Sequence, residues 1–245
     1  MTKNLAQNLT QNLTVKIWRG TAEDGAFETY SVPGLKSQSV LDVVTYVQRH
    51  LDETLTYRFA CRVGMCGSCA MTVNGMPRWT CRTHVDKVAE NNQLIIEPLR
   101  NLEIIRDLAT DMAPFFEKWQ NANARFEGKL SRHDKIPAID PTGKKRQAAS
   151  AAIECINCAV CYSACDTVAA RCDYVGPAAL NRAWSLVNDE KHIGQTGLKK
   201  AVKTDGGCYS CHSHGSCSQS CPVGLDPAGS IGSLKRAYSL FGQLT

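Results

Sequence analysis

The sequence predicts an α+β protein in which a region of mixed strands and helix comes first and a helical region follows. Residues 13–32 alternate apolar and polar side chains, as strands do. Residues 40–51 repeat apolar side chains at helical spacing, and residues 176–184 begin with a glycine and a proline and continue as good helix formers. At 245 residues, the chain is long enough for two domains that each bury a core.

The number and spacing of the cysteines indicate which class of protein the chain belongs to. The chain has 13 cysteines, an odd count, and several are spaced as tightly as C-x2-C, with no apolar leader segment after Met1. These features disfavour a secreted disulfide scaffold and favour metal ligation in a reducing compartment. No run of about twenty apolar residues is present, so we expect no membrane span. The net charge of +5 suits an acidic partner or a membrane surface but is too weak to indicate nucleic acid.

The first elements form a small sheet covered by a helix. The alternation in Leu13–Arg19 ends at Gly20, which predicts a strand followed by a turn, and 27–32 is its expected hairpin partner. Ser39 is placed as the N-cap of a helix. Its apolar positions recur at helical spacing and are expected in the core: Leu41, Val44, Val47 and Leu51.

The first cysteine group has the spacing C-x4-C-x2-C-x11-C, which is typical of a plant-type 2Fe-2S cluster. Gly64 and Gly67 allow a loop whose backbone N–H groups approach the sulfur atoms. Asn74-Gly75 predicts a hairpin turn that returns the chain to this loop. The alternative is a structural zinc site, but such sites usually pair two C-x2-C knuckles and only one is present. The predicted 2Fe-2S ligands are Cys61, Cys66, Cys69 and Cys81.

The second group is the run C-x2-C-x2-C-x3-C at residues 155–165. Four thiols within eleven residues cannot all form disulfides without severe bending, whereas a cuboidal cluster accepts three of them from one turn of chain. In two-cluster ferredoxins the fourth cysteine of such a run binds the other cluster. A second group that exchanges a ligand in return is therefore expected.

That partner group is Cys211, Cys217 and Cys221 followed by Pro222, with His214 where a further cysteine would stand. A cubane that lacks one thiolate tends to lose that iron, so a 3Fe-4S cluster is predicted here. The exchange of ligands assigns Cys155, Cys158, Cys161 and Cys221 to a 4Fe-4S cluster. It assigns Cys165, Cys211 and Cys217 to the 3Fe-4S cluster.

Three further side chains in this region need an assignment. Imidazole can bind iron, so His214 is a possible ligand, but we expect it to face solvent or a polar neighbour. Cys208 forms an extra C-x2-C with Cys211 and could compete for its place. We expect Cys208 and Cys172 to be small buried side chains rather than ligands.

The connecting segments are assigned from their apolar pattern and their breakers. Residues 102–119 repeat apolar side chains at roughly helical spacing, and Pro114 is expected to kink or interrupt the helix. Residues 135–146 are basic and contain proline, which predicts an exposed linker ending in a solvated Lys-Lys-Arg run. A glycine and a proline at 176–177 mark the start of a helix that continues to Trp184.

The four-cysteine loop, the segment Glu97–Met112 and the run at 155–165 together resemble the iron-sulfur subunit of succinate dehydrogenase and fumarate reductase. The resemblance implies a β-grasp, plant-type ferredoxin domain followed by an all-α, bacterial-type ferredoxin domain, with the same partition of ligands. We expect a polar tail at 1–12, the 2Fe-2S domain at 13–107 and a connecting helix and basic linker at 108–150. The helical domain with the 4Fe-4S and 3Fe-4S clusters is then 151–245.

The functional expectation is electron relay. No nucleophile–base pair, phosphate loop or nucleotide fingerprint accompanies the cysteines, so no catalytic residue is predicted in this chain. The resemblance implies a flavoprotein subunit with FAD, which holds the dicarboxylate site, and membrane anchor subunits that present quinone. The chain would then be peripheral on the cytoplasmic face of the inner (cell) membrane.

The resemblance also places His212 in the vicinity of the quinone. Asp166 stands where the family commonly has proline, and residues 167–171 contain no tryptophan, so this segment is closer to fumarate reductases than to succinate dehydrogenases. Two other classes remain as alternatives. One is the iron-sulfur subunit of a soluble complex, such as a thiol-linked fumarate reductase or a heterodisulfide-type enzyme, and the other is a zinc-stabilised binding module.

Overall fold

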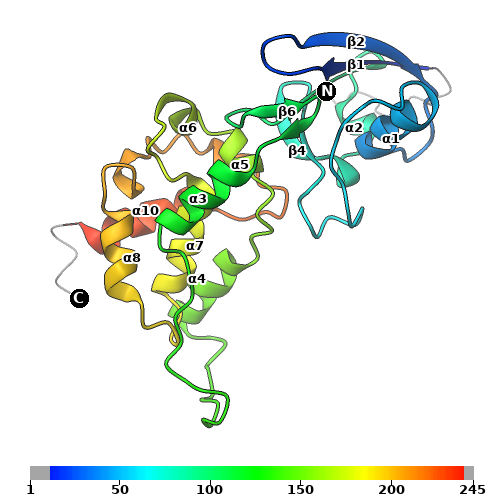
Figure 1. Cartoon of the computed structure of the whole chain (residues 1–245). Helices are drawn as coiled ribbons and strands as arrows, with labels where there is room; N and C mark the ends of the chain where they lie inside the picture. The colour runs from blue at the N-terminus through cyan, green and yellow to red at the C-terminus, as the bar shows by residue number, and fades with distance from the viewer. Residues whose placement is uncertain (1–11, 240–245) are drawn as a thin grey trace, which may run out of the picture. The chain divides into compact units, whose positions relative to one another are not determined.

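The computed structural model of the chain describes residues 12–239, which divide into two compact units (Figure 1). Unit 1 contains the described residues up to Met112 together with Ile156–Ser163, and unit 2 contains Ala113–Cys155 together with the described residues from Ala164 onward. The polar tail predicted for residues 1–12 lies, except for Asn12, outside the described residues. The domain limits proposed from the sequence stay a prediction.

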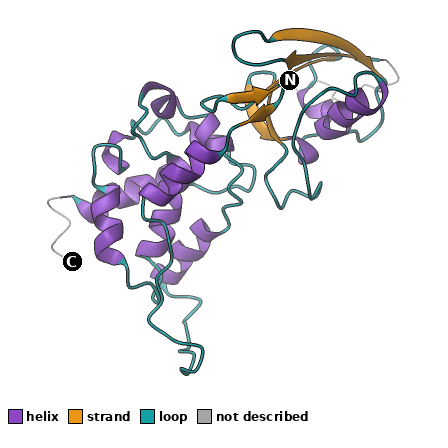
Figure 2. Ribbon diagram, in the orientation of Figure 1, coloured by secondary structure: helices purple, strands orange, loops and turns teal. Residues whose placement is uncertain are grey.

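Unit 1 is built on a five-stranded mixed sheet in the order β2-β1-β5-β3-β4. Figure 2 shows strands in orange. β1 is antiparallel to β2 and parallel to β5, and β3 is antiparallel to both β4 and β5. The strands are β1 (Leu13–Arg19), β2 (Ala26–Val32), β3 (Ala70–Val73), β4 (Met76–Trp79) and β5 (Gln93–Glu97). The predicted first strand, its hairpin partner and the Asn74-Gly75 hairpin are confirmed.

The core of unit 1 lies between this sheet and helix α1 (Val40–His50). Alternate side chains of β1 are buried and join the valines of α1 in a single hydrophobic cluster. Ser39 caps the helix as predicted: its hydroxyl accepts a hydrogen bond from the backbone N–H of Asp42, whose carboxylate accepts one from the backbone N–H of Ser39. The cap and the apolar stripe together fix where α1 starts and which face it buries. The prediction that Leu51 lies in the core is wrong, because Leu51 is the C-cap of α1 and is exposed.

The helix predicted for residues 102–119 is wrong in its first half. Residues 104–110 form a short hairpin, β6 (Ile104–Arg106) and β7 (Ala109–Thr110), and helix α3 spans only Ala113–Asn121. Asp107 at the turn has a φ of +51° and accepts hydrogen bonds from the backbone N–H groups of Gly20 and Thr56. These distant contacts override the local helical pattern, and Pro114 lies in the first turn of α3 instead of kinking a longer helix.

Three short helices complete unit 1. They are the 3₁₀ helix η1 (Thr80–Arg82), α2 (Val85–Val88) and α5 (Val160–Ser163). The last belongs to unit 1 together with residues 156–159, although the chain on either side of Ile156–Ser163 belongs to unit 2. The backbone N–H of Arg100 donates to Ser163 Oγ at 2.8 Å, and Asn101 Nδ2 donates to the carbonyl of Tyr162 at 3.0 Å.

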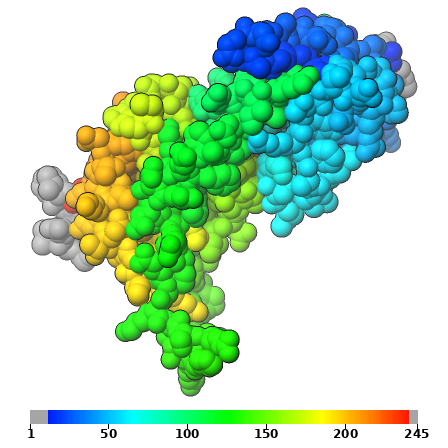
Figure 3. All heavy atoms as spheres, viewed as in Figure 1, coloured from blue at the N-terminus to red at the C-terminus, as the bar shows by residue number. Residues whose placement is uncertain are grey.

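Unit 2 is helical, as predicted, with an isolated bridge between Gly128 and His192. Its helices are α3, α4 (Lys144–Ile153), α6 (Asp166–Ala170), α7 (Pro177–Val187), α8 (Gln195–Val202), η2 (Cys208–Ser210), α9 (Ser216–Gln219) and α10 (Pro227–Tyr238). Helix α7 begins at a proline, as its sequence predicted. The long loop between α3 and α4 extends away from the helices (Figures 1 and 3).

Candidate iron-sulfur cluster sites

The four cysteines of the first group come from one loop and one hairpin of unit 1. Cys69 immediately precedes β3, and Cys81 lies in η1 just after β4. The antiparallel pairing of β3 and β4 therefore returns Cys81 to Cys69. Thr80 secures this end of the hairpin, because its backbone N–H and its hydroxyl both donate to the carbonyl of Cys69, at 3.2 and 2.7 Å.

The loop that carries Cys61 and Cys66 turns its backbone N–H groups toward sulfur. The N–H groups of Val63, Met65 and Cys66 lie 3.3–3.4 Å from Cys61 Sγ, and Ser68 Oγ lies 3.0 Å from Cys66 Sγ. Left-handed backbone at Gly64 (φ +77°) and Gly67 (φ +71°) makes this wrapping possible. Such donors stabilise a negatively charged thiolate.

The pKa values of two of these thiols indicate which cysteines lie next to one another. The hydrogen bond from Ser68, assisted by those from the Cys61 N–H and thiol, lowers the pKa of Cys66 to about 6. Burial, followed by the hydrogen bond and charge of Cys69, raises the pKa of Cys81 to about 11. Cys61 therefore lies beside Cys66, and Cys69 lies beside Cys81.

The donor set of this loop fits a 2Fe-2S cluster. It offers four thiols in two neighbouring pairs, together with N–H and O–H donors directed at their sulfur atoms. No group of three or more His, Cys, Asp or Glu side chains within residues 12–239 is arranged to hold a single metal ion. A 2Fe-2S cluster divides its four thiolates between two iron atoms, so its ligands do not converge on one point.

The ligands predicted for the 4Fe-4S cluster are divided between the two units. Cys158 and Cys161 belong to unit 1, where Cys161 lies in α5 and is buried. Cys155 and Cys221 belong to unit 2, where Cys221 Sγ accepts a hydrogen bond from the backbone N–H of Leu225 at 3.3 Å. The set of four stays a prediction.

The ligands predicted for the 3Fe-4S cluster all belong to unit 2. Burial and the nearby charges of Cys165 and Cys211 raise the pKa of Cys217 to about 11, so these three thiols lie near one another. Burial raises the pKa of Tyr174 as well, assisted by the charges of the same thiols and by a hydrogen bond with Cys211. Three gathered thiols are the donor number that a 3Fe-4S cluster needs.

The histidines and cysteines that the sequence did not assign firmly as ligands differ in how exposed they are. His212 and His214 are both exposed, and their ring centres are 6.1 Å apart. Cys208 is fully buried, as predicted, and burial raises its pKa. Cys172 is exposed, so the prediction that it is a buried side chain is wrong. It lies two residues beyond the end of α6, between Arg171 and Asp173, whose side chains form an exposed ion pair.

Sequence patterns missed three residues that surround the cysteines. Tyr174 lies nine positions beyond Cys165, and Lys235 lies on α10, where its Nζ donates to the carbonyl of Cys211 at 2.6 Å. Neither position carries a motif. Ser68 could have been found, because a hydroxyl between two predicted ligands is within reach of their sulfur atoms.

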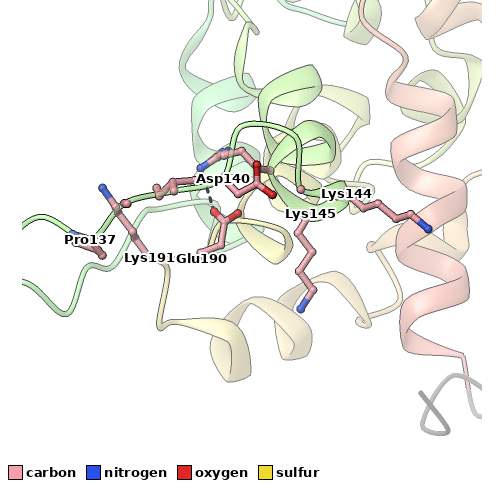
Figure 4. A pocket seen from close by; sticks show the side chains of 10 residues that line it. Pro137, Asp140, Lys144, Lys145, Glu190 and Lys191 are labelled. Atoms are coloured by element: carbon pink, nitrogen blue, oxygen red, sulfur yellow. Dashed lines mark hydrogen bonds and ion pairs between the residues drawn. The ribbon is translucent and has the colours of Figure 1, made fainter.

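The basic run at the start of α4 lines a pocket in unit 2 that contains no cysteine (Figure 4). Arg146 pairs with Asp189 at 3.3 Å and with Glu190 at 3.2 Å, whereas Lys144 and Lys145 are exposed and point away from Glu190. The predicted linker therefore ends at Gly143, because residues 144–146 form the first turn of the helix. Only the two lysines of this run are solvated surface.

Comparisons with known protein families cover most of the chain. A family described as "2Fe-2S iron-sulfur cluster binding domain" matches residues 14–117, and one described as "4Fe-4S dicluster domain" matches residues 151–225. Among the described residues, no helix has both the length and the apolar character needed to cross a membrane.

Similar proteins agree with these matches. The fumarate reductase iron-sulfur subunit of Mycobacterium tuberculosis is 37% identical over 209 residues, which is 84% of this chain and 83% of that protein. The subunit of the same name from Haemophilus influenzae is 33% identical, over 83% of this chain and 82% of that protein. A chain of the Mycobacterium smegmatis Sdh1 complex in the apo form shares the fold, with a TM-score of 0.84, 23% identity and coverage of 94% and 96%.

The α+β fold class, the two cluster domains and the family resemblance predicted from the sequence are thereby confirmed. The relatives are subunits of oxidoreductases, and the matched domains are those of iron-sulfur electron carriers. This chain belongs to the iron-sulfur subunits of the succinate dehydrogenase and fumarate reductase family.

Proposed function

We propose that this chain relays single electrons between a flavoprotein subunit and membrane quinone, in a complex that interconverts succinate and fumarate. The clusters supply the one-electron carriers when bound. The proposed ligands are Cys61, Cys66, Cys69 and Cys81 for 2Fe-2S; Cys155, Cys158, Cys161 and Cys221 for 4Fe-4S; and Cys165, Cys211 and Cys217 for 3Fe-4S. The observation that carries the proposal is the gathering of the thiols within the first and third of these sets.

The chain's own residues hold and tune these sites. Donors from the 61–69 loop surround Cys61 and Cys66 and favour the more negative, reduced state of whatever the thiolates bind. In unit 2, Tyr174 and Lys235 contact Cys211 through its sulfur and its carbonyl. The run at 155–165 contributes ligands to both the 4Fe-4S set and the 3Fe-4S set, so it connects two clusters that are adjacent in the proposed electron path.

The 61–69 loop is proposed as the end that faces the flavoprotein and its FAD. Val63 and Met65 are 54% and 70% exposed, although both are large apolar side chains, and Cys66 between Met65 and Gly67 is exposed too. Exposed apolar side chains around a redox site suit a surface that a partner covers. A covering subunit would exclude water from this loop and bring its own cofactor near.

The opposite end of the relay is proposed to face quinone. His212 follows a 3Fe-4S ligand directly and is exposed, which leaves its imidazole able to donate to a quinone oxygen. Anchor subunits would hold the quinone and place this chain on the cytoplasmic face of the membrane. In this proposal His214 is a neighbouring exposed imidazole and not an iron ligand.

Metal and sulfide analysis with EPR tests the proposal on the purified complex. Three clusters predict about nine iron atoms per chain, with matching acid-labile sulfide and a 3Fe signal in the oxidised state. Zinc without sulfide would overturn it. If the 3Fe signal is absent from the wild type but appears in His214→Ala, then the histidine is a ligand and the assignment of the third cluster fails.

Fractionation and electron acceptors test the partners. The complex should sediment with membranes and exchange electrons with a soluble quinone analogue, and His212→Ala should weaken that exchange while leaving all three EPR signals intact. A complex that stays soluble and uses thiol or disulfide substrates would replace the quinone part of the proposal with the soluble alternative. The iron-sulfur clusters would remain in either case.

A further inference from the structure

Gly67 lies where two predicted cluster-binding segments of unit 1 meet. It stands between Cys66 and Cys69 on the 61–69 loop, and Cys158 lies on the separate segment that leads into α5. A Cβ atom added to Gly67 would be 2.6 Å from Cys158 Cβ and 2.8 Å from Cys158 Cα. Non-bonded carbon atoms pack at about 3.5 to 4.0 Å, so only glycine admits this approach.

The backbone around Cys158 is held in place by its own contacts within unit 1. Asn157 and Ala159, which flank it, both have left-handed backbone, with φ values of +54° and +59°. This conformation is uncommon for residues other than glycine and persists only where surrounding structure enforces it. Ala159 is 1% exposed, and α5 is tied to residues 100 and 101 by two hydrogen bonds. The segment therefore has little freedom to retreat from a side chain at position 67.

We propose that Gly67 is a positioning residue that sets the separation between the 2Fe-2S and 4Fe-4S sites. The inference rests on the proposed function, because it takes Cys66 and Cys69 as ligands of one cluster and Cys158 as a ligand of the other. Electron tunnelling slows exponentially with distance, and the contact at Gly67 is where the two ligand-bearing segments touch. A side chain there would move them apart without removing a ligand.

An alternative explanation is that glycine is needed at position 67 only because the backbone there has a positive φ. Gly75 separates the two explanations, because its φ of +76° matches the +71° of Gly67 while nothing lies within 4 Å of an added Cβ. Alanine at either position meets the same backbone penalty. Only alanine at position 67 meets Cys158, so the difference between the two variants reports the contact itself.

The test compares Gly67→Ala with Gly75→Ala in the purified complex, by EPR spin relaxation. Two paramagnetic clusters interact through a dipolar coupling that weakens steeply with distance, so reduction of the 4Fe-4S cluster should speed the relaxation of the reduced 2Fe-2S signal. We expect this acceleration in the wild type and in Gly75→Ala. In Gly67→Ala we expect both EPR signals to persist and part of the acceleration to be lost.

Each outcome decides the proposal. Equal acceleration in both variants would overturn it, as would loss of the 2Fe-2S signal alone, which would mean that Gly67 serves only its own loop. If Gly67→Ala does not assemble, the wild type still provides a test, because clusters that relax independently there would overturn the inference. A complex without 2Fe-2S and 4Fe-4S signals contradicts the proposed function itself and is recognised before any variant is compared.

Discussion

Arg19 Nε lies 3.2 Å from Asp107 Oδ1, and the two side chains are 10% and 1% exposed. The pair joins the end of β1 to the turn between β6 and β7. Asp107 also accepts hydrogen bonds from the backbone N–H groups of Gly20 and Thr56, both at 2.7 Å. One buried carboxylate therefore fastens three segments of unit 1 that are distant in the sequence.

Replacing Asp107 by asparagine should destabilise the chain. The change leaves Arg19 with its other acidic partners, Asp52 and Glu28, but it replaces a buried charged acceptor by an amide, which predicts a loss of about 2 to 3 kcal/mol in the free energy of unfolding. Urea unfolding followed by circular dichroism measures it. Glu53→Gln, at an exposed position, is the matched control and should change stability by less than about 0.5 kcal/mol. Equal stability of the two variants would contradict the role of Asp107.

Among the proposed 2Fe-2S ligands, Cys66 should react before Cys81 when the chain is free of clusters. The pKa of Cys66 is lowered to about 6, so its thiolate predominates above that pH, whereas the pKa of Cys81 is raised to about 11 and it stays protonated at neutral pH. Alkylation follows the thiolate fraction. Cys66 should therefore be modified before Cys81 at about pH 7, with a rate that rises through pH 6, as mapped by mass spectrometry.

Ser68→Ala provides the control for that reactivity. It removes the hydrogen bond that contributes most to the shift, so the pKa of Cys66 should return toward its ordinary value and alkylation at neutral pH should slow several-fold. Modification of Cys81 ahead of Cys66 in the wild type would show that the loop does not hold its thiols as described.

Ser68 should also tune the 2Fe-2S cluster once it is bound. Its hydroxyl lies 3.0 Å from Cys66 Sγ, and a donor to a ligand sulfur stabilises the reduced state. A net hydrogen bond of about 1 kcal/mol corresponds to about 40 mV for one electron, so Ser68→Ala should lower the midpoint potential by that order. Redox titration followed by EPR measures the shift. Ser68→Thr, which keeps the hydroxyl, should stay near the wild-type potential.

Local chemistry made part of the fold and of the site predictable. Ser39 caps α1, Asn74-Gly75 turns the hairpin, and the spacing from Cys61 to Cys69 places three thiols on one loop. Each of these features is decided by residues within about ten positions of one another, so the sequence pattern contains the whole cause.

The features that escaped prediction depend on distant partners. The hairpin at 104–110 forms because Asp107 binds backbone groups of Gly20 and Thr56, which no window of sequence around residue 107 reveals. The contact of Gly67 with Cys158 spans two motifs that were recognised separately. Tyr174 reaches Cys211 only through the packing of unit 2. In all three cases, tertiary structure supplies the second partner.

Tyr174 should raise the potential of the third cluster. Its side chain is 1% exposed, and its hydroxyl is placed to donate to the sulfur of Cys211. Tyr174→Phe keeps the ring in the core and removes only that donor, so the midpoint potential of the 3Fe-4S signal should fall by about 40 mV, for a net hydrogen bond of about 1 kcal/mol. EPR-monitored redox titration of the complex measures the change.

The matched control for Tyr174→Phe is Tyr209→Phe. Tyr209 is 48% exposed, and its hydroxyl donates to the carbonyl of Lys235 at 3.4 Å instead of to a cysteine sulfur. Loss of that hydroxyl should leave the potential unchanged. A shift of equal size in both variants would mean that the potential responds to general loosening of unit 2. A shift confined to Tyr174→Phe would identify a single buried hydroxyl as the group that stabilises the reduced cluster.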